Sequence, residues 1–529
     1  MAETRHESDA SGITGGEKWP ATQPEVSFVK TQETSPARSD GKIILDEIEG
    51  YEHTAYAFSN KRKWWILTVV ALCQTSMNFN AAVYSNAVHP LNEHYGITRA
   101  RDGMAGFLIT YAFGCEFWAP WSEEFGRWKI MQASLFFINV WQPLAGASTS
   151  WNQVLAARVL GGFSTAGGSV TLGMVADMFD AEEQQYAVLW ASFWSCVGSV
   201  IGGICGGPIE QYLSWRWNFW IQLIFGGVVQ IIHACSVPET RSTCMLDAAA
   251  KKLRKRDPAC NVYGPNETKR LRQRLSFGET VKTMWRPYHM LLFEPIVLCL
   301  SLLSGFSDAL IFSFLESYGI VFGQWGFTPT QFSMAMFALF IGYCAAYASF
   351  FPVIRWHNHL RAAGDPTLTP ESRLWWLLFL APLLPMGLLG SAFTVTGPPL
   401  PWIAPLVFAV LIGAANMAIY YATIDYMVAA YGGKYSASAT GGNGFSRDLL
   451  AGLCAFYTGP MYKQLGTKNS TLLLFAVSVL VCIPVYIFYW KGPVIRERSR
   501  WAEKIKADKE KMAEVRQRML EMRRTQAQV

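Results

Sequence analysis

Residues 470–490 read STLLLFAVSVLVCIPVYIFYW, an apolar run without a single charged residue. A helix needs about 20 such residues to cross about 30 Å of hydrocarbon, so this run predicts a membrane-spanning helix. Further runs of similar length and polarity precede it along the chain. The composition agrees, because 51% of the 529 residues are hydrophobic and only 16% are charged, against about 25% in soluble proteins. The sequence therefore predicts a polytopic membrane protein.

The apolar runs form two groups of six, separated by a charged segment. The predicted spans are approximately 64–85, 104–121, 130–149, 152–177, 186–208 and 216–236, followed by 291–320, 331–353, 374–395, 401–425, 436–460 and 470–490. Residues 237–290 hold 12 Lys/Arg against 5 Asp/Glu and are too polar to enter a bilayer. A six-plus-six arrangement is typical of a duplicated bundle whose halves face each other across a central path.

The predicted fold is an all-α membrane protein with twelve transmembrane helices in two six-helix halves. Its expected parts are a disordered N-terminal tail (1–63), the N-terminal half (64–236), a basic linker (237–290), the C-terminal half (291–490) and a basic C-terminal tail (491–529). Lys and Arg concentrate on one side of the spans, so the positive-inside rule places both tails and the linker in the cytoplasm. The net charge of +6 thus reflects topology, and no nucleic-acid partner is expected.

Motifs of most enzymes and of disulfide-rich secreted proteins are missing from the sequence. The 11 cysteines are spread through apolar segments without paired spacing, and no Gly-Lys is followed by Ser or Thr as an ATP-binding loop requires. No cofactor and no metal are therefore expected. His357 and His359 leave open a membrane-embedded enzyme that acts on lipid. Asn469 begins an Asn-Ser-Thr sequon and is a candidate for N-glycosylation, although it adjoins the last span.

The loop between the second and third spans reads WAPWSEEFGRWK at 118–129. An acid, a tight glycine turn and a base in one short loop can fasten two helix ends together. Glu123, Gly126 and Arg127 are therefore the candidate residues of an inner gate. In span five, glycines recur four residues apart, a spacing that lets helices approach closely. This packing motif consists of Gly198, Gly202, Gly203, Gly206 and Gly207.

Three further segments, SWRWNFW at 214–220, VPETR at 237–241 and NGFSRD at 443–448, accompany the loop and the glycines. Together these motifs resemble the major facilitator superfamily, and within it the fungal twelve-span drug:proton antiporters. The resemblance implies that Glu123 and Arg127 lock the inner face and that the glycine motif marks antiport. Gly203 stands where that motif has Pro, which keeps import open as an alternative. The resemblance also implies transport by alternating access.

Ionisable residues inside the predicted spans are functional candidates, because a charge in the bilayer is costly. Glu116 and Asp308 lie mid-span and are the expected cavity carboxylates. The resemblance implies a part in proton coupling for Arg158, while bracing of helices stays open as its role. Arg447 and Asn443, from the NGFSRD segment, complete the predicted set of proton-coupling or cavity residues.

These features predict a secondary active transporter that exports an amphipathic organic compound in exchange for protons. The expected partners are the small organic substrate, protons and the lipid bilayer, with the protein acting as a monomer in the plasma membrane or the vacuolar membrane. A facilitator or proton symporter that imports a small metabolite stays open, as does the lipid-modifying enzyme. The substrate is not predicted, because drug-type cavities bind by shape and apolar area with few diagnostic polar contacts.

Overall fold

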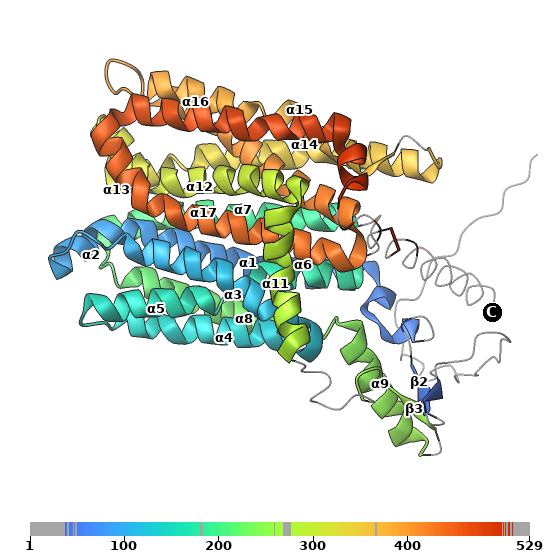
Figure 1. Ribbon diagram of the computed structural model, residues 1–529. Helices are drawn as coiled ribbons and strands as arrows, with labels where there is room; N and C mark the ends of the chain where they lie inside the picture. The colour runs from blue at the N-terminus through green and yellow to red at the C-terminus, as the bar shows by residue number, and fades with distance from the viewer. Residues whose placement is uncertain are drawn as a thin grey trace, which may run out of the picture.

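The computed structural model describes residues 50–179, 184–258, 260–267, 277–365 and 368–499, together with the short pieces 38–39, 42–45, 47, 501, 503, 506–507 and 510. Helices dominate this part of the chain. Figure 1 shows two bundles of roughly parallel helices lying against each other, the first coloured blue to green and the second yellow to red. The two bundles correspond to the two predicted halves.

The first half is built from eight helical elements. They are α1 (Asn60–Val83), α2 (Val88–Tyr95), α3 (Asp102–Phe125), α4 (Arg127–Gly146), α5 (Trp151–Phe163), α6 (Gly167–Met178), α7 (Gln184–Tyr212) and α8 (Trp217–Ser236), with the short η3 (Tyr84–Ala87) between α1 and α2. Gly126 separates α3 from α4 with a φ of +104°, a conformation that residues with a Cβ rarely adopt. The sharp reversal expected from the glycine in the 118–129 loop is therefore present.

The second half contains α12 (Pro295–Gly323), α13 (Pro329–Met334), α14 (Phe337–Ala362), η4 (Pro370–Leu374), α15 (Leu377–Leu380), α16 (Leu383–Thr394) and α17 (Ile403–Glu497). The backbone of α17 is not helical at Gly432 or at Gly466, where φ is +74° at both residues. These two glycines divide α17 into a first section (403–431), a second section (433–465) and a third section (467–497). Figure 1 shows the sections folded back against one another in orange and red.

Nine helical segments among the described residues are long and apolar enough to cross a membrane. The twelve predicted spans fall on helical elements, although 152–177, 331–353 and 374–395 each cross a break between two or more of them. The numbers of predicted spans and of candidate spans differ for identifiable reasons. The helices α3 and α4 are not among the nine. Glu116 lies in the middle of α3, and Gln132, Asn139 and Gln142 lie inside α4, so polar residues lower the mean hydropathy of both helices. The last two predicted spans, 436–460 and 470–490, fall in one continuous candidate, Tyr435–Glu497.

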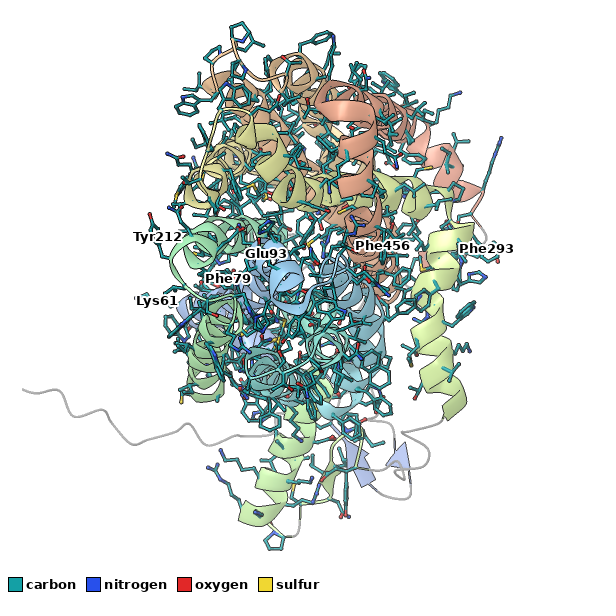
Figure 2. All side chains as sticks on the ribbon, turned by 90° about the vertical axis from the view of Figure 1, so that its left-hand side faces the viewer. Lys61, Phe79, Glu93, Tyr212, Phe293 and Phe456 are labelled. Carbon is teal, nitrogen blue, oxygen red and sulfur yellow. The ribbon has the colours of Figure 1, made fainter. Side chains whose placement is uncertain are left out.

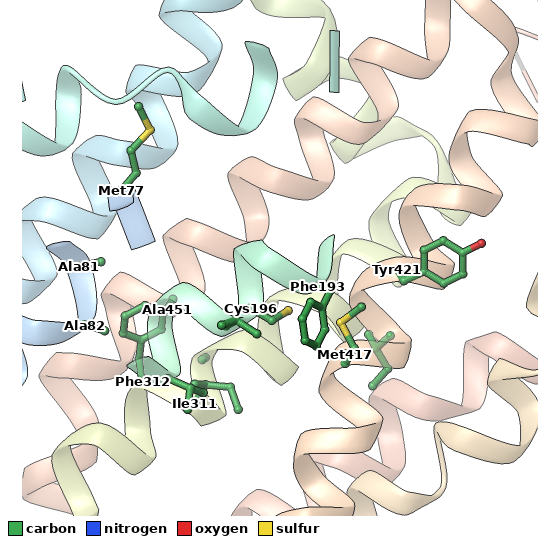
Figure 3. Close-up of a cluster of buried hydrophobic side chains, with 14 of the residues drawn as sticks. Met77, Ala81, Ala82, Phe193, Cys196, Ile311, Phe312, Met417, Tyr421 and Ala451 are labelled. Carbon is green, nitrogen blue, oxygen red and sulfur yellow. The ribbon is translucent and has the colours of Figure 1, made fainter. Parts of the chain in front are cut away.

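The two halves meet through apolar side chains as well as through polar ones. Figure 3 shows Phe193 and Cys196 of α7 close to Ile311 and Phe312 of α12 and to Met417 of α17. All five residues are less than a tenth exposed and belong to one continuous core. Burial of such side chains stabilises the pairing of the halves by about 25 cal/mol for each Å² removed from contact with water.

One end of the bundle, here called the basic end, carries the beginning of α1, the α3–α4 loop and the ends of α14 and α17 (Figure 1). A small module extends from it. Its elements are β1 (Arg38–Ser39), β2 (Lys42–Ile44), η1 (Tyr51–His53), η2 (Ala55–Ala57), α9 (Ser242–Arg256) and β3 (Val262–Tyr263). The sheet order is β1-β2-β3, with β1 antiparallel and β3 parallel to β2. Another helix, α11 (Phe277–Phe293), crosses the side of the bundle steeply (Figures 1 and 2).

The N-terminal tail differs from the predicted disorder where the structure describes it. Residues 42–44 form a strand because their backbone pairs with the linker strand β3, a partner that the composition of the tail does not reveal. The positions 60–63 belong to α1, and α17 continues to Glu497. The predictions for residues 1–37 and 511–529 lie outside the described residues.

Candidate functional site

A small cavity lies between the two halves, near the middle of the helices that line it. The first half contributes Asn78, Ser195 and Cys196, and the second contributes Asp308, Tyr420, Arg447 and Asp448, among others. The volume open to water within it is only about 10 Å³, which is room for one water molecule. The cavity is therefore closed in this structure, with its polar side chains packed against one another.

Arg447 is at the centre of the charges in the cavity. Its Nε lies 3.9 Å from Oδ2 of Asp308, and its Nη2 lies 3.4 Å from Oδ1 of Asp448. Its guanidinium carbon lies 4.3 Å from the centre of the Tyr420 ring. Arg447 is only 5% exposed, and a buried guanidinium is tolerated when carboxylates compensate its charge. The structure thus brings together Asp308 and Arg447, which the sequence singled out separately, and adds Asp448.

A chain of hydrogen bonds joins this charged cluster to the first half. The Tyr420 hydroxyl donates to Oγ of Ser195 over 3.1 Å, and Nδ2 of Asn78 donates to the same oxygen over 2.9 Å. The Tyr111 hydroxyl in turn donates to Oδ1 of Asn78, and Nε2 of Gln74 donates to that hydroxyl. The helices α1, α3 and α7 are therefore connected to Arg447 through neutral groups. A change in the position or charge of the cluster would alter these contacts between the two halves.

Glu116 lies on α3 at the seam with the second section of α17, outside the residues that line the cavity. It is 3% exposed, and a Cβ added to Gly441 would lie 2.8 Å from its Oε1. One turn earlier on α3, the ring of Phe113 packs 5.1 Å from that of Phe445. Asp448 is the charged residue that acts electrostatically on Glu116. The predicted pair of cavity carboxylates, Glu116 and Asp308, is thus split between the seam and the cavity.

Arg158 lies entirely within the first half and is 3% exposed. Its Nη1 donates to the carbonyl and the side-chain oxygen of Asn80, at 3.1 and 2.9 Å, and its Nε donates to the carbonyl of Gly103 at 3.2 Å. Its guanidinium carbon sits 4.4 Å from the Tyr84 ring centre and 4.2 Å from that of Phe107. These neutral partners match the bracing role that the sequence left open.

Arg127 at the basic end pairs with Asp177 at the end of α6, with 2.9 Å between Nε and Oδ2 and both side chains 7% exposed. Asp177 also meets Arg241, at 3.4 Å. The carboxylate of Glu239 accepts from the backbone N–H groups of Arg127 and Trp128, so it caps the N-terminus of α4. The loop is therefore fastened to the end of α6 and to the first residues of the linker, as a latch would be.

The other two residues of the predicted gate, Glu123 and Gly126, do not take part in the ion pair of Arg127. Glu123 is half-buried, and the carboxylate that pairs with Arg127 is that of Asp177 rather than Glu123. A Cβ on Gly126 would collide with the Glu239 carboxylate. Gly126 is thus required both by its backbone conformation and by the close approach of the capping acid.

The glycines of α7 face two different partners. A Cβ at Gly198 would lie 2.7 Å from the carbonyl oxygen of Thr75, and one at Gly202 would lie 2.8 Å from that of Phe79, both on α1. Gly206 faces α1–η3 in the same way, at Asn86. Gly203 and Gly207 face the second half instead, where Gly207 approaches the carbonyl oxygen of Pro329. The motif therefore packs α7 within its own half and against the other half at once.

The remaining predicted residues lie apart from the cavity. Asn443 is 0% exposed on the second section of α17, and both of its side-chain polar atoms find no partner within the described residues. Asn469 is exposed just after the break at Gly466. His357 is buried and His359 is exposed, two residues apart on α14, so they do not converge on one site. No group of three metal-ligating side chains occurs in the part of the chain that the structure describes.

The family model of the Major Facilitator Superfamily matches residues 70–455. This chain belongs to the major facilitator superfamily. It is 29% identical over 449 residues to the MFS-type transporter kojT of Aspergillus flavus, covering 83% of this chain and 79% of that protein. It is 30% identical over 395 residues to the efflux pump atB of Aspergillus terreus, covering 73% and 81%. Among solved structures, the human organic anion transporter MFSD10 covers 81% of this chain and is itself fully covered, with a TM-score of 0.57 and 15% identity.

Membership of the major facilitator superfamily makes the chain a membrane transporter and not an enzyme. The alternative of a lipid-modifying enzyme at His357 and His359 is therefore wrong. The family resemblance expected from the motifs is confirmed by the match across both halves. The MFSD10 likeness supports the fold alone.

Several residues of the site were not singled out from the sequence. Asp448 directly follows Arg447 in the NGFSRD segment, so adjacency to a buried base was the available signal. The sequence held no signal for Tyr420 and Ser195, because a tyrosine or serine in an apolar span is common. Their hydrogen bond joins two residues that are 225 positions apart along the chain. Asp177 could have been found as an acid at the very end of the predicted span 152–177.

Proposed function

We propose that this major facilitator is a proton-coupled exporter of an amphipathic organic compound, working by alternating access. Its twelve membrane spans would comprise the nine candidates, α3 and α4, and the division of Tyr435–Glu497 at Gly466. The basic end would face the cytoplasm, because the Lys/Arg-rich α9 and loops gather there. The plasma membrane is the proposed location, with the vacuolar membrane as the alternative.

The single observation that carries the proposal is the cluster of Asp308, Arg447 and Asp448 in a closed cavity between the halves. Two carboxylates share one guanidinium, so one negative charge is left uncompensated when both acids are ionised. A proton or a cationic substrate can neutralise that charge, and competition between the two gives exchange. The name of the relative atB supports export as the direction.

The neighbourhood of the cluster favours an amphipathic organic cation as substrate. Tyr343, Tyr420 and Phe312 line the same cavity as the carboxylates, and aromatic faces attract organic cations. An open form of the cavity would offer these rings together with the acids. The volume in the closed form is too small for such a ligand, so binding requires the halves to rock apart.

The test uses the full-length protein in liposomes with the fluorescent amphipathic cation rhodamine 6G and an imposed pH gradient. We expect uphill movement of the dye against the proton flow, and loss of that movement when a protonophore collapses the gradient. Uphill movement in the same direction as the protons would indicate a symporter. Dye movement that is equally fast without a gradient would indicate a facilitator, and either result would contradict the proposal.

A further inference from the structure

Several buried polar side chains on α12 and α17 have no role in the cavity. Asn443 is 0% exposed with both amide atoms unpartnered within the described residues. Ser301 and Ser304 on α12 are 0% and 2% exposed, and neither hydroxyl has a partner in the part of the chain that the structure describes. Buried polar atoms in native proteins are nearly always hydrogen-bonded, to protein or to ordered water.

These orphaned groups lie at one level of the bundle. The Ser446 hydroxyl donates to the carbonyl oxygen of Ser301 over 3.2 Å, so α12 and the second section of α17 touch there. A Cβ on Gly305 would lie 2.9 Å from the carbonyl oxygen of Ser446, which continues the contact one turn further. Asn443 lies one turn before Ser446. The polar groups therefore gather along a single helix–helix seam.

The seam leads from the basic end toward the cavity. Glu294 precedes α12 at the basic end, where its carboxylate accepts from the hydroxyl of Ser499, 2.8 Å away. Glu294, the N-cap of α12, is followed at intervals of seven residues by Ser301 and Asp308. Each interval turns the helix face by only about 20°, so the three positions stay on one side of α12 within about 40°. Each interval of seven residues covers about 10 Å. Asn443 precedes Arg447 by one turn, so both helices carry a polar group between the basic end and the charged cluster.

We propose that Ser301, Ser304 and Asn443 bind a short file of water molecules that conducts protons between Glu294 and the Asp308–Arg447–Asp448 cluster. The path from Glu294 to Asp308 covers two intervals, about 20 Å in all, with Ser301 at its midpoint. Each orphaned atom gains a partner from water held along it. A carboxyl at each end provides a group that accepts and releases the proton. The transport part of this inference rests on the proposed proton coupling, whereas the presence of water does not.

Other titratable and charged groups also lie near the end of this path that meets the Asp308–Arg447–Asp448 cluster. From α3 these are Tyr111, Cys115 and Glu116, from α7 Cys196, from α14 Tyr343, and from α17 Tyr420 and the cluster itself. At the basic end, Glu294 meets Tyr431 and Ser499, and His289 of α11 acts on it electrostatically. None of these groups lies on the α12 face between Glu294 and Asp308, so Ser301 and the neighbouring orphaned atoms are left to hold the connecting water.

The first experiment detects water directly in the purified full-length protein. Hydroxyl radicals made by X-ray radiolysis label side chains next to ordered water, and Leu300 and Leu303 are both 0% exposed beside Ser301 and Ser304. We expect both leucines to be labelled in the wild type and their labelling to fall by about tenfold in Asn443→Leu, whose side chain is apolar and similar in size. Absence of labelling in the wild type would overturn the proposal.

The second experiment measures transport in the same liposomes with rhodamine 6G. We expect Asn443→Leu and the double change Ser301→Ala with Ser304→Ala to lose gradient-driven accumulation by about tenfold, while dye exchange at equal pH stays at the wild-type rate. The matched control is Ser478→Ala, because Ser478 is equally buried but donates to the carbonyl of Phe475. Asn443→Ser, which can still bind water, should recover part of the accumulation.

The outcomes separate the two proposals. A wild type without gradient-driven transport contradicts the proposed function, and the labelling of Leu300 and Leu303 then still decides whether the seam holds water. A wild type that is gradient-driven, with variants that accumulate dye equally well, contradicts the proton path alone. Loss of exchange together with accumulation would mean a structural fault, and the proton path would then be rejected if Asn443→Ser shows the same loss.

Discussion

Each half of the molecule buries an arginine among its helices, but the two arginines meet different groups. Arg158 is held by the carbonyl oxygens of Asn80 and Gly103 and by two aromatic rings. Arg447 is held by Asp308 and Asp448. The partners of Arg158 do not change charge in any physiological range, whereas carboxylates do when protonated. A fixed charge and a switchable charge are thus placed in opposite halves, and only the second can respond to a proton.

The largest effect is expected from Arg447→Ala. Removal of the guanidinium leaves two buried carboxylates without their counter-charge, which should lower the free energy of unfolding by about 3–5 kcal/mol and abolish gradient-driven dye transport. Thermal unfolding and the liposome assay measure the two consequences. Adding Asp308→Asn and Asp448→Asn should restore much of the stability but none of the coupling. A stable Arg447→Ala protein with normal accumulation would mean that the cluster is not the coupling site.

Arg158→Gln should show the opposite pattern. It removes hydrogen bonds to neutral acceptors and two ring contacts, so we expect a loss of about 2–3 kcal/mol in unfolding free energy. The surviving folded protein should keep the wild-type dependence of dye accumulation on the pH gradient. If this variant instead stays stable and loses that dependence, Arg158 takes part in coupling and the contrast between the halves disappears.

A smaller effect is expected at the latch of the basic end. Asp177→Asn weakens the buried contact with Arg127, which retains a hydrogen bond to Ser122 at 2.6 Å, so we expect a loss of about 1–3 kcal/mol. Glu123→Gln should change the free energy of unfolding by less than about 0.5 kcal/mol, because Glu123 is only half-buried and does not pair with Arg127. Thermal unfolding of the two variants side by side measures this. Equal losses of unfolding free energy in the two variants would show that Glu123 stabilises the loop as much as Asp177 does.

The smallest effect concerns a half-buried arginine, Arg254 of α9, whose Nη1 and Nη2 each lie 2.8 Å from an oxygen of Glu267. Partial burial raises the pKa of the Glu267 carboxyl, but the hydrogen bonds from Arg254 and from the Gly264 N–H outweigh it, so this pKa lies below its ordinary value. The stabilisation is therefore complete above the ordinary glutamate pKa and disappears as pH falls through the lowered one.

Hydrogen exchange of residues 260–267 measures this last effect. Protection of their amides should stay constant from neutral pH down to the ordinary glutamate range and fall below it. The variant Glu267→Gln, which cannot ionise, should show weaker protection at neutral pH and a flatter pH profile. A wild type whose protection falls already at neutral pH would contradict this assignment.

The fold class was accessible from the sequence because membrane helices are long and mostly apolar, so the predicted spans fall on helical elements. Single buried charges such as Asp308, Arg158 and Arg447 could be recognised for the same reason, since a charge stands out in an apolar run. The partners of these buried charges could not be recognised from the sequence. Arg127 meets Asp177 and Glu239, which lie 50 and 112 residues away along the chain, and no local pattern specifies such pairings. The orphaned Asn443 was named, but its isolation depends on packing against α12.

The pairing of β2 with β3 has a mechanical consequence. β2 precedes the first half and β3 follows it, so the chain leaves the module, forms all of α1–α8 and returns to the same sheet. The first half is thereby enclosed in a non-covalent ring. The chain that connects this sheet to α12 is therefore shorter than the full linker 237–290, and opening the sheet would lengthen the connection. A transporter of this design can have its range of motion set by a strand that never enters the membrane.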